Sequence, residues 1–432
     1  MPAPMSGPAH PPVPLPTEQL RVGMTLPFTL LDAAGRVLLA KGHAIEDEQQ
    51  LRLLRERRQV FVPFEESELA VKVLMTGLLE LDRRGGAIKD LDRYVRLDEG
   101  EADGQGAEPL RGTLPEQCAE VSARLRRLLA GIEMGAVAPA EGPARFERLW
   151  RDIGQLTASA AQAEAGTLVL TYRACTSPAE YSVLHALQCA VLARQVAPLL
   201  GLQGQEARTL VLATASMNVA MLRLQDALAQ QHGAPSPVQR AQIDAHAAEG
   251  ERLLRAAGVA DPLWLEAVRL HHTPLAPGVR LAQRPPAQRL AHVIQVLDRY
   301  TASMSPRASR PGRTAKDAAR TAILFRTGGE QDEVGLALVR LLGMYPPGTF
   351  VRLKGGETAL VLRRGARAGT PVVAVVVNRA GEPLGTPKLV STARAGQEVA
   401  DAVPGSAVRA RVNLDEMVRL LAYSRTPAAG LG

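Results

Sequence analysis

Helical periodicity over residues 181–342 constrains the fold of this chain more than any other feature of its sequence. Apolar residues recur there at intervals of three and four, the spacing that places them on one face of an α-helix. Short stretches rich in Gly, Pro or Arg interrupt the pattern at 201–204, 233–235, 274–278 and 307–313. The segments between them have ordinary helix lengths, so the sequence predicts a bundle of at least five helices.

The pattern changes on both sides of this bundle. Two short apolar runs around Asp32-Ala-Ala-Gly35 predict a β-hairpin, and a helix over 45–57 with a strand at 60–62 completes a small α/β module. After the bundle, three apolar runs separated by Gly-containing turns predict strands over 349–353, 358–362 and 371–377. The fold class is therefore mainly α, with a small N-terminal α/β module and a small C-terminal β appendage.

We divide the chain on these grounds into six parts. They are a tail expected to be disordered at 1–16, the α/β module at 17–66, a helical and flexible linking region at 67–163, the helical domain at 164–345, a β-rich piece at 346–400, and a short helix and tail at 401–432. Within the linking region the spacing predicts helices over 67–81, 114–132 and 145–163. The Gly, Asp and Glu residues of 96–113 predict a flexible stretch, and a last helix is expected over 414–421.

Composition restricts the classes of function. The formal net charge is +7 over 432 residues, and only 3% of the residues are aromatic. No basic cluster is interleaved with aromatic residues, so we do not expect nucleic acid as the partner. The three scattered cysteines fit a reducing compartment, residues 1–16 lack the pattern of a signal peptide, and no apolar run approaches the length of a membrane span. We therefore expect a cytoplasmic protein without a membrane span.

Four of the eight histidines and one aspartate occur in an order that suggests a metal site. They are His185, His246, His271, His272 and Asp298. A single histidine on a helix is more often a core or surface residue than a ligand, so the joint order carries the prediction. Imidazole and carboxylate groups are common ligands of divalent transition metals.

Around these residues the sequence resembles the HD-GYP family, a branch of the HD-domain phosphohydrolases. The resemblance covers roughly 165–400, and its motifs are Tyr181-Ser-x-x-His185, Gln242-Ile-x-x-His246-Ala-x-x-Gly250, His271-His272 and Leu297-Asp298-Arg-Tyr-Thr-Ala302. The segment 342–351 resembles the family's junction between helical core and β piece, and 22–42 resembles a module that often precedes this domain. The resemblance implies an HD-type helical bundle, two or three metals, commonly iron or manganese, and hydrolysis of cyclic di-GMP by a metal-bound hydroxide.

The family's central His-Asp pair is replaced in this chain. By position, Met217 stands where the family has the histidine, and Asn218 stands where it has the aspartate that bridges two metals. A thioether and a neutral amide cannot do the work of an imidazole and a bridging carboxylate on hard divalent ions. After His272 the loop is shortened and lacks the family's acidic residue and Gly-Tyr-Pro motif, and the usual Arg-Pro-Tyr-Arg is changed at 305–313.

Two hypotheses follow. In the first, the chain is a catalytically impaired HD-GYP-like protein with a binding or regulatory role linked to cyclic di-GMP signalling, because groups that act as a unit are lost together. In the alternative, it is an active metal-dependent phosphodiesterase with an altered site. There His246, His271 and His272, joined by the amide oxygen of Asn218, hold one Fe or Mn ion, while His185 and Asp298 form a partial second site. The cofactor is thus none or one divalent metal.

Cyclic di-GMP itself and a signalling protein such as a diguanylate cyclase are the partners that the resemblance implies. Five arginines near the inferred site have the geometry to bind phosphate through paired hydrogen bonds. They are Arg280, Arg284, Arg307, Arg310 and Arg313. The alternative interpretation is that they are solvated loop residues of an Arg-rich sequence. The family's loop for protein contacts is missing here, which weakens the prediction of a protein partner.

Overall fold

The computed structural model describes residues 109–325, 331–367 and 369–426 and parts of the N-terminal region. The described N-terminal residues are 13–15, 22, 26, 29–33, 35–40, 43, 45–56 and 60–62. The chain divides into two compact units, 1–107 and 108–432. The finer division into six parts stays a prediction. The helix predicted over 67–81 and most of the flexible stretch 96–113 lie outside the described residues.

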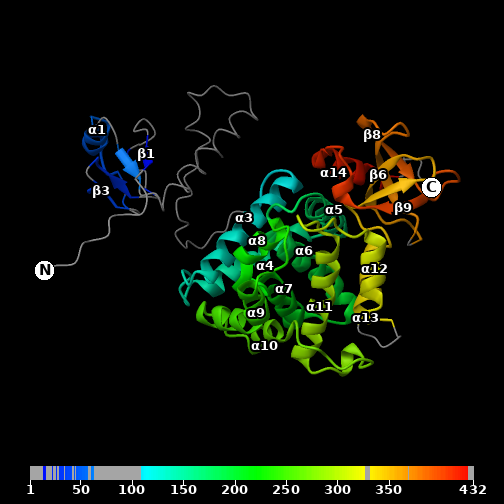
Figure 1. Ribbon diagram of the computed structural model, residues 1–432, viewed down its shortest axis with the longest axis horizontal. Coiled ribbons are helices and arrows are strands. Elements are labelled where there is room, and N and C mark those ends of the chain that lie inside the picture. The colour runs from blue at the N-terminus through cyan, green and yellow to red at the C-terminus, as the bar shows by residue number, and fades with distance from the viewer. Residues whose placement is uncertain are drawn as a thin grey trace. The chain divides into compact units, whose positions relative to one another are not determined.

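Among its described residues, the N-terminal unit forms a four-stranded antiparallel sheet and one helix (Figure 1). The elements are β1 (Val13–Leu15), β2 (Leu30–Leu31), β3 (Val37–Leu39), α1 (Glu48–Glu56) and β4 (Val60–Val62), with strand order β1-β4-β2-β3. The predicted hairpin, helix and strand are confirmed. The expectation of a disordered tail is wrong for Val13–Leu15, because this segment pairs with Val60–Val62 and so has hydrogen-bond partners that a free tail lacks.

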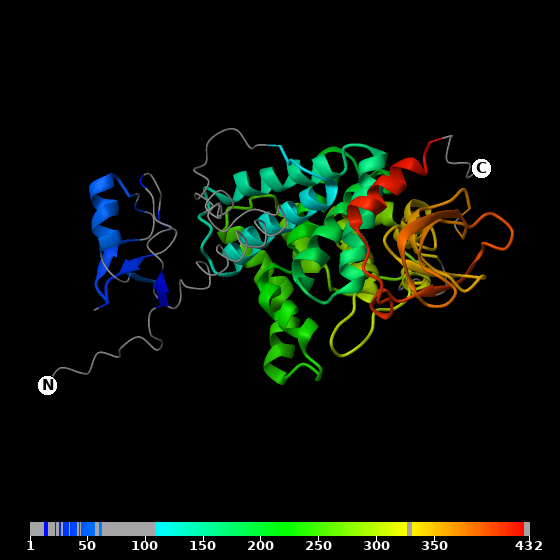
Figure 2. The ribbon, with the colours of Figure 1, turned by 90° about the horizontal axis from the view of Figure 1, so that it is seen from above.

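The larger unit is a helical bundle that carries a β-sheet near its C-terminal end (Figures 1 and 2). Its helices are α3 (Leu114–Glu133), α4 (Gly142–Leu156), α5 (Ala160–Thr176), α6 (Tyr181–Val196), α7 (Gly204–Ser216), α8 (Leu222–Gln230), α9 (Pro237–Ala256), α10 (Pro262–Leu270), α11 (Pro286–Met304), α12 (Ala315–Ile323), α13 (Glu333–Leu342) and α14 (Leu414–Tyr423). Short 3-10 turns are η3 (Ala197–Leu200), η4 (Val219–Met221), η5 (Leu281–Gln283) and η6 (Gly405–Ala407). α6 is the central helix, since it contacts α3, α5, α7, α8, α11 and α13 and almost all of its residues are buried. The predicted mainly α bundle is confirmed.

The single helix predicted over 145–163 is wrong, because two helices occupy this range. α4 ends before Thr157, and α5 begins after Ser159, whose hydroxyl accepts a hydrogen bond from the amide N–H of Gln162 at 3.2 Å. A serine at this position satisfies an amide group that the first turn of a helix leaves free. The polar residues Thr157 and Ser159 therefore mark a boundary that the apolar spacing hides.

A five-stranded antiparallel sheet follows the bundle, with strand order β8-β7-β6-β5-β9. Its strands are β5 (Phe350–Leu353), β6 (Thr358–Arg363), β7 (Val372–Val377), β8 (Pro383–Ser391) and β9 (Val399–Val403). The first three confirm the predicted strands. The last two are missing from the prediction because exposed polar, Gly and Pro residues interrupt their apolar alternation.

Alternate residues of the central strands belong to two different cores, as the period of a strand dictates. On one face, Phe350, Leu360 and Leu362 join the core of the helical bundle. On the other face, Val351 and Val361 belong to a second, smaller core. Both faces of the sheet are therefore apolar, which explains the continuous valine run of β7.

Gly348 fixes the junction between the bundle and the sheet. Its φ is +89°, and a Cβ there would lie 2.4 Å from the carbonyl oxygen of Leu168 and 2.7 Å from the amide nitrogen of Tyr172, both on α5. Glycine alone combines this backbone conformation with so close an approach.

We expect Gly348→Ala to lower the free energy of unfolding by about 2–4 kcal/mol, because the methyl group meets backbone atoms while the residue keeps a positive φ. Gly356→Ala is the matched control, since Gly356 has a φ of +96° and open space around an added Cβ. It should lose only about 1–2 kcal/mol. Urea titration followed by circular dichroism measures both, and equal losses would contradict the close packing at Gly348.

The expectation that no apolar run reaches membrane-spanning length needs correction. Among the described residues, the segment Tyr181–Leu200, formed by α6 and η3, is long and apolar enough to cross a membrane by length and composition. Its most apolar window is 72% buried within the structure. A helix at the centre of a bundle contacts other elements on every side, so all of its faces are apolar.

Candidate metal centre

Three histidine side chains meet where α9 approaches the end of α10. His246 lies in the middle of α9, His271 directly follows α10, and His272 is next in the chain. One ring nitrogen from each lies within 4.8 Å of the others. His246 and His271 are buried, whereas His272 is exposed. The cluster thus offers two buried ligands and one at the solvent boundary.

Backbone carbonyl groups fix the tautomers of the two buried histidines. The Nδ1–H of His246 donates to the carbonyl oxygen of Ile243, and the Nδ1–H of His271 donates to that of Val268 at 2.6 Å. Each ring is therefore held by its own helix, and its Nε2 carries the lone pair when the ring is neutral. Metal-bound histidines commonly have their other nitrogen hydrogen-bonded in this way.

The two Nε2 atoms of His246 and His271 face each other at 3.1 Å. Burial and the neighbouring His272 and His246 lower the pKa of His271 to about 3, and burial also lowers the pKa of His246. Both rings are thus neutral at pH 7, and no proton separates their lone pairs. Two ligands at right angles around one ion, each about 2.1 Å from it, are about 3.0 Å apart. The spacing of the two nitrogens fits a shared cation.

Close packing at Gly250 brings these two histidines together. Gly250 lies one turn after His246 on α9, and an added Cβ would lie 3.4 Å from Cγ1 of Val268 on α10 and 3.6 Å from Cγ1 of Val219 on η4. The carbonyl group of Val268 in turn holds the ring of His271. A side chain larger than a methyl group at this position would separate α9 from α10 and from η4.

Met217 and Asn218 lie where α7 ends and η4 begins. Met217 is fully buried in the hydrophobic core, and its carbonyl oxygen would lie 3.7 Å from a Cβ at Gly250. Asn218 is 6% exposed, and its Oδ1 is buried without a hydrogen-bond partner among the described residues. An unpartnered buried amide oxygen is costly, and a neutral oxygen is an acceptable ligand for a divalent ion. The converging lone pairs of the histidines fit one bound ion, and Asn218 has an amide oxygen that no described residue engages.

His185 and Asp298 pair with each other instead of facing an open site. Nε2 of His185 donates to Oδ1 of Asp298 at 2.8 Å, and Nδ1 lies 3.1 Å from Oγ1 of Thr301. Burial opposes a charge on His185, but Cys189, Tyr181 and Asp298 outweigh it and raise the pKa of His185. Burial likewise opposes ionisation of Asp298, but the hydrogen bond and charge of His185 hold the pKa of Asp298 below its usual value. The two residues form an ion pair that leaves His185 no free lone pair for a metal.

The structure separates the five arginines into two groups. Arg280 and Arg284 lie in the loop after His272. Arg280 is largely exposed and pairs with Glu333 at 3.6 Å. Arg284 is buried and donates to the carbonyl oxygen of Ala276 at 2.8 Å, which shapes the loop. Both have protein partners, and the Nε of Arg284 is buried without a partner among the described residues.

The other group lies beside the His185 pair. Arg307 donates to the hydroxyl of Tyr181 at 3.1 Å and lies over its ring, and that ring stacks on His185. Burial and the positive charges of Arg307 and Arg313 lower the pKa of Arg310. Within the described part of the chain, no carboxylate pairs with these three arginines, and the Nε of Arg307 is buried without a partner. This group has the charge that an anionic ligand requires.

Sequence reasoning missed the partners of two histidines. Thr301 contacts both His185 and Cys189, whose Sγ lies 3.0 Å from its Oγ1. His292, predicted to lie outside the ligand set, pairs with the buried Asp332 at 2.7 Å. The sequence signal for Asp332 is its place before a helix, where it caps α13. That signal does not reveal that Asp332 also pairs with His292 on α11.

No family model matches the chain. The chain is 29% identical over 252 residues to the cyclic di-GMP phosphodiesterase PA4108 of Pseudomonas aeruginosa. This match covers 57% of the chain and 60% of the relative, so the chain spans about three fifths of that protein's length. Among solved structures, Bd1817, a HDG"Y"P protein from Bdellovibrio bacteriovorus, matches 76% of this chain and 98% of its own, with 13% identity and a TM-score of 0.40. A structural likeness this distant supports no argument about the site.

The similarity to PA4108 and the order of the histidine motifs support an HD-GYP family assignment for this chain.

Gly250→Val should reduce the metal bound per chain and lower the free energy of unfolding by about 1–3 kcal/mol, because the added groups force α9 away from α10. Gly250→Ala is the matched control, since its methyl group would stand at ordinary contact distance from its neighbours. Mass spectrometry of bound metal, with urea titration alongside, measures both effects. If Gly250→Val kept full metal content, the packing at Gly250 would have no part in forming the site.

The low pKa of His271 predicts a pH effect on the stability of the metal-free protein. A histidine in the unfolded chain has a pKa of about 6.5, whereas that of buried His271 is about 3, so between these values the unfolded state binds more protons. The free energy of unfolding should therefore fall as the pH drops from about 6.5 towards 3, by at most about 1.4 kcal/mol per pH unit from this residue.

His271→Asn removes this contribution, so its stability should depend less steeply on pH than that of the unmodified protein. His232→Asn, at an exposed position, should leave the slope unchanged. Chemical denaturation of chelated protein across this pH range gives the slopes. Identical slopes for the unmodified protein and His271→Asn would mean that His271 titrates normally.

Proposed function

We propose that this chain is a catalytically impaired HD-GYP protein of cyclic di-GMP signalling, which keeps a single-ion site and acts by binding. The ion is held by His246, His271 and His272, with Asn218 as a neutral oxygen ligand. The observation that supports this most is the convergence of three histidines, while Asn218 brings no charge and the nearby carboxylate of Asp298 is already paired with His185. The proposed ion is iron or manganese.

Charge explains why one ion is the limit. Two divalent cations about 4 Å apart repel each other by about 17 kcal/mol at an effective dielectric constant of 20. A bridging carboxylate offsets much of this repulsion in a two-metal site. Asn218 brings no charge, and Asp298 is engaged by His185 at 2.8 Å. Among the described residues, Asp298 is therefore the carboxylate that acts on the three histidines, and its charge is shared with His185.

The arginines at 307, 310 and 313 support a role in binding an anion. They lie close enough for their charges to oppose one another, and Arg307 is fixed on Tyr181 beside the His185 pair. Cyclic di-GMP carries two phosphate groups, and arginine suits paired hydrogen bonds to phosphate. The curated relative is named for action on this nucleotide. We therefore propose cyclic di-GMP as the ligand of this group.

One observation favours a second candidate, a single-ion phosphodiesterase. His272 is exposed, so positions around a bound ion that face solvent are open to water. One metal ion is able to activate a water molecule for attack on a phosphoester. This candidate differs from the main proposal in requiring turnover.

The direct test is to incubate the full-length protein, loaded with manganese, with cyclic di-GMP and to measure binding and products separately. We expect calorimetry to show binding that Arg310→Glu weakens at least tenfold, while the exposed Arg280→Glu changes it little. Chromatography should recover the nucleotide intact. Robust hydrolysis by the unmodified protein would overturn the proposal in favour of the second candidate, and a lack of binding would exclude the proposed ligand.

Restoring the family pair by Met217→His with Asn218→Asp should raise the bound metal from about one ion per chain to about two, because an imidazole and a bridging carboxylate are returned. Turnover of cyclic di-GMP should stay low, since the loop after His272 remains short. Asn218→Asp alone is the control that separates the charge from the added imidazole. Metal analysis and product chromatography give the two results, and no gain of metal in the double variant would contradict the assigned positions.

A further inference from the structure

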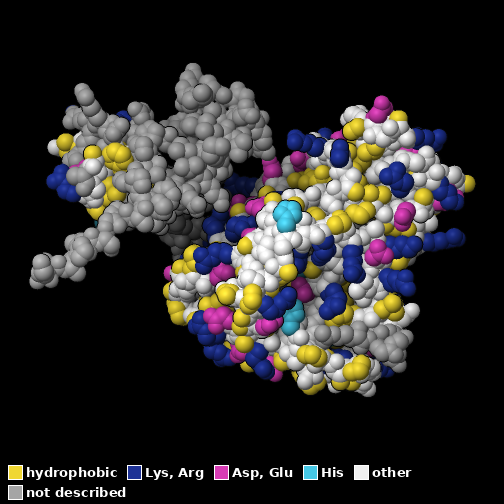
Figure 3. All heavy atoms as spheres, in the orientation of Figure 1, with side chains coloured by type: hydrophobic (Ala, Val, Ile, Leu, Met, Phe, Trp, Pro, Cys, Tyr) yellow, Lys and Arg dark blue, Asp and Glu magenta, His cyan; other side chains and the backbone are white. Residues whose placement is uncertain are grey.

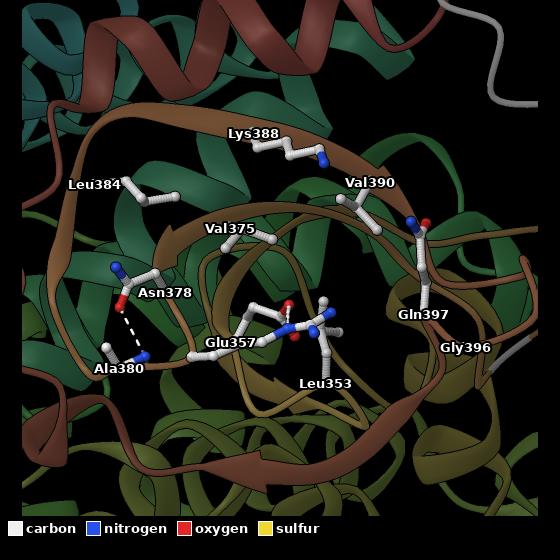
Figure 4. Close-up of a pocket in the computed structure, with 11 residues that line it drawn as sticks. Leu353, Glu357, Val375, Asn378, Ala380, Leu384, Lys388, Val390, Gly396 and Gln397 are labelled. Atoms are coloured by element: carbon white, nitrogen blue, oxygen red, sulfur yellow. Dashed lines mark hydrogen bonds and ion pairs between the residues drawn. The ribbon is translucent and has the colours of Figure 1, made fainter.

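A cavity of about 490 Å³ opens on the face of the C-terminal sheet that does not pack against the helical bundle (Figure 4). It lies at one end of the sheet, where β5 and β6 are joined by a turn and β7 is joined to β8. This volume is within the usual range for small-molecule sites, which often lie at the mouths of curled sheets. The cavity shares no residue with the histidine cluster, so an inference from it is independent of the proposed function.

Aliphatic side chains form the floor of the cavity. Leu353, Val375, Leu384 and Val390 line it from three strands. Val375 and Val390 are buried parts of the second core, and Leu384 packs against that core while remaining half exposed. An apolar surface of this kind takes up the apolar part of a ligand by removing it from water.

Lys388 stands over this floor. On β8, Lys388 and Val390 share one face, since alternate residues of a regular strand point to the same side. Lys388 lies directly opposite Val375 in the pairing of β8 with β7, and Figure 4 shows its amine on the side of Val390. In the described parts of the chain, no carboxylate forms an ion pair with this amine.

The remaining charged groups of the rim neutralise each other. Arg379 donates to Glu357 at 2.6 Å, and this pair lies beside the floor. The lining therefore has two positive groups and one carboxylate, and Lys388 is the positive group without a direct ion pair among the described residues. The polar groups of Asn378 and Gln397 complete the lining.

The charge of the surrounding region has the same sign. Residues 346–432 contain twelve Lys or Arg and six Asp or Glu, a net charge of +6 out of +7 for the whole chain. Figure 3 shows Lys and Arg side chains distributed around this part of the surface. Such a field raises the local concentration of small anions.

We propose that the cavity binds a small organic anion, with its apolar body on the floor of Leu353, Val375 and Val390 and its charged group against Lys388. The volume of the cavity fits a small molecule and not a folded partner. Lysine suits this role because its ammonium group pairs with carboxylate, sulfonate or phosphate alike. The site would make the C-terminal sheet a sensor for a metabolite of this chemical class.

A pair of fluorescent probes tests the proposal on the full-length protein. Anilinonaphthalene sulfonate has an apolar body and one negative charge, and N-phenylnaphthylamine has a similar body without the charge. Lys388→Glu should weaken binding of the sulfonate at least tenfold and leave binding of the neutral probe within about twofold. Leu384→Trp, which fills the mouth of the cavity, should weaken both probes.

Arg352→Glu is the matched control, because it makes the same change of charge on β5 next to Leu353 but at an exposed position outside the lining. It should leave both probes unaffected, and circular dichroism checks that every variant is folded. β8 is an edge strand, where an inward lysine also discourages pairing with other chains. Equal binding of the sulfonate by Lys388→Glu and the unmodified protein would overturn the proposal and leave Lys388 that protective role alone.

Discussion

The close crossing of α9 with α10 and with the turn after α7 is the constraint on which the site depends. Gly250 permits this crossing, because a side chain larger than that of alanine would meet Val268 and Val219. Once the helices are this close, the backbone carbonyl groups of Ile243 and Val268 orient two imidazole rings towards each other. The lone pairs then converge at 3.1 Å in a buried place that does not favour protonation. A cation is the simplest way to satisfy them.

The proposed single-ion centre is consistent with the residues at the positions of the family pair. Replacing a bridging carboxylate by Asn218 removes a charge but keeps an oxygen, and Met217 fills the core where an imidazole would need polar partners. His185 and Asp298 then pair with each other, which satisfies two groups that would otherwise be buried without partners. The three histidines of the cluster still lie within 4.8 Å of one another through their ring nitrogens. This arrangement is the basis of the proposed single-ion site.

The sequence predicted much of the fold because periodicity reports which face of an element is buried. It identified the bundle, the three central strands of the C-terminal sheet and the last helix. The sequence prediction joined α4 and α5 into one helix. The boundary between them is marked by Thr157 and by the capping hydroxyl of Ser159, and not by a change in the spacing of apolar residues. The prediction also failed for β8 and β9, which lie at the edges of the sheet and keep exposed polar residues.

The candidate site was predicted as a set of residues but not as an arrangement. The order of the motifs identified five candidate ligand residues. His185 and Asp298 are 113 residues apart in the sequence, however, and the sequence cannot show that they pair with each other instead of binding a common ion. The orphaned oxygen of Asn218 and the facing nitrogens of His246 and His271 are equally invisible in the sequence. Such contacts depend on which helix faces meet, and that is decided by packing at residues such as Gly250.

X-ray absorption spectroscopy on the purified full-length protein, with metal and protein quantified in the same sample, tests the central claim most directly. The account predicts about one ion per chain, a first coordination sphere rich in imidazole nitrogen at about 2.1 Å, and no scattering from a second metal. A metal–metal distance of about 3.5–4 Å, as in two-metal sites, would contradict the single-ion centre. Protein prepared with iron and manganese present that retained neither would contradict the claim that the converging histidines bind a metal.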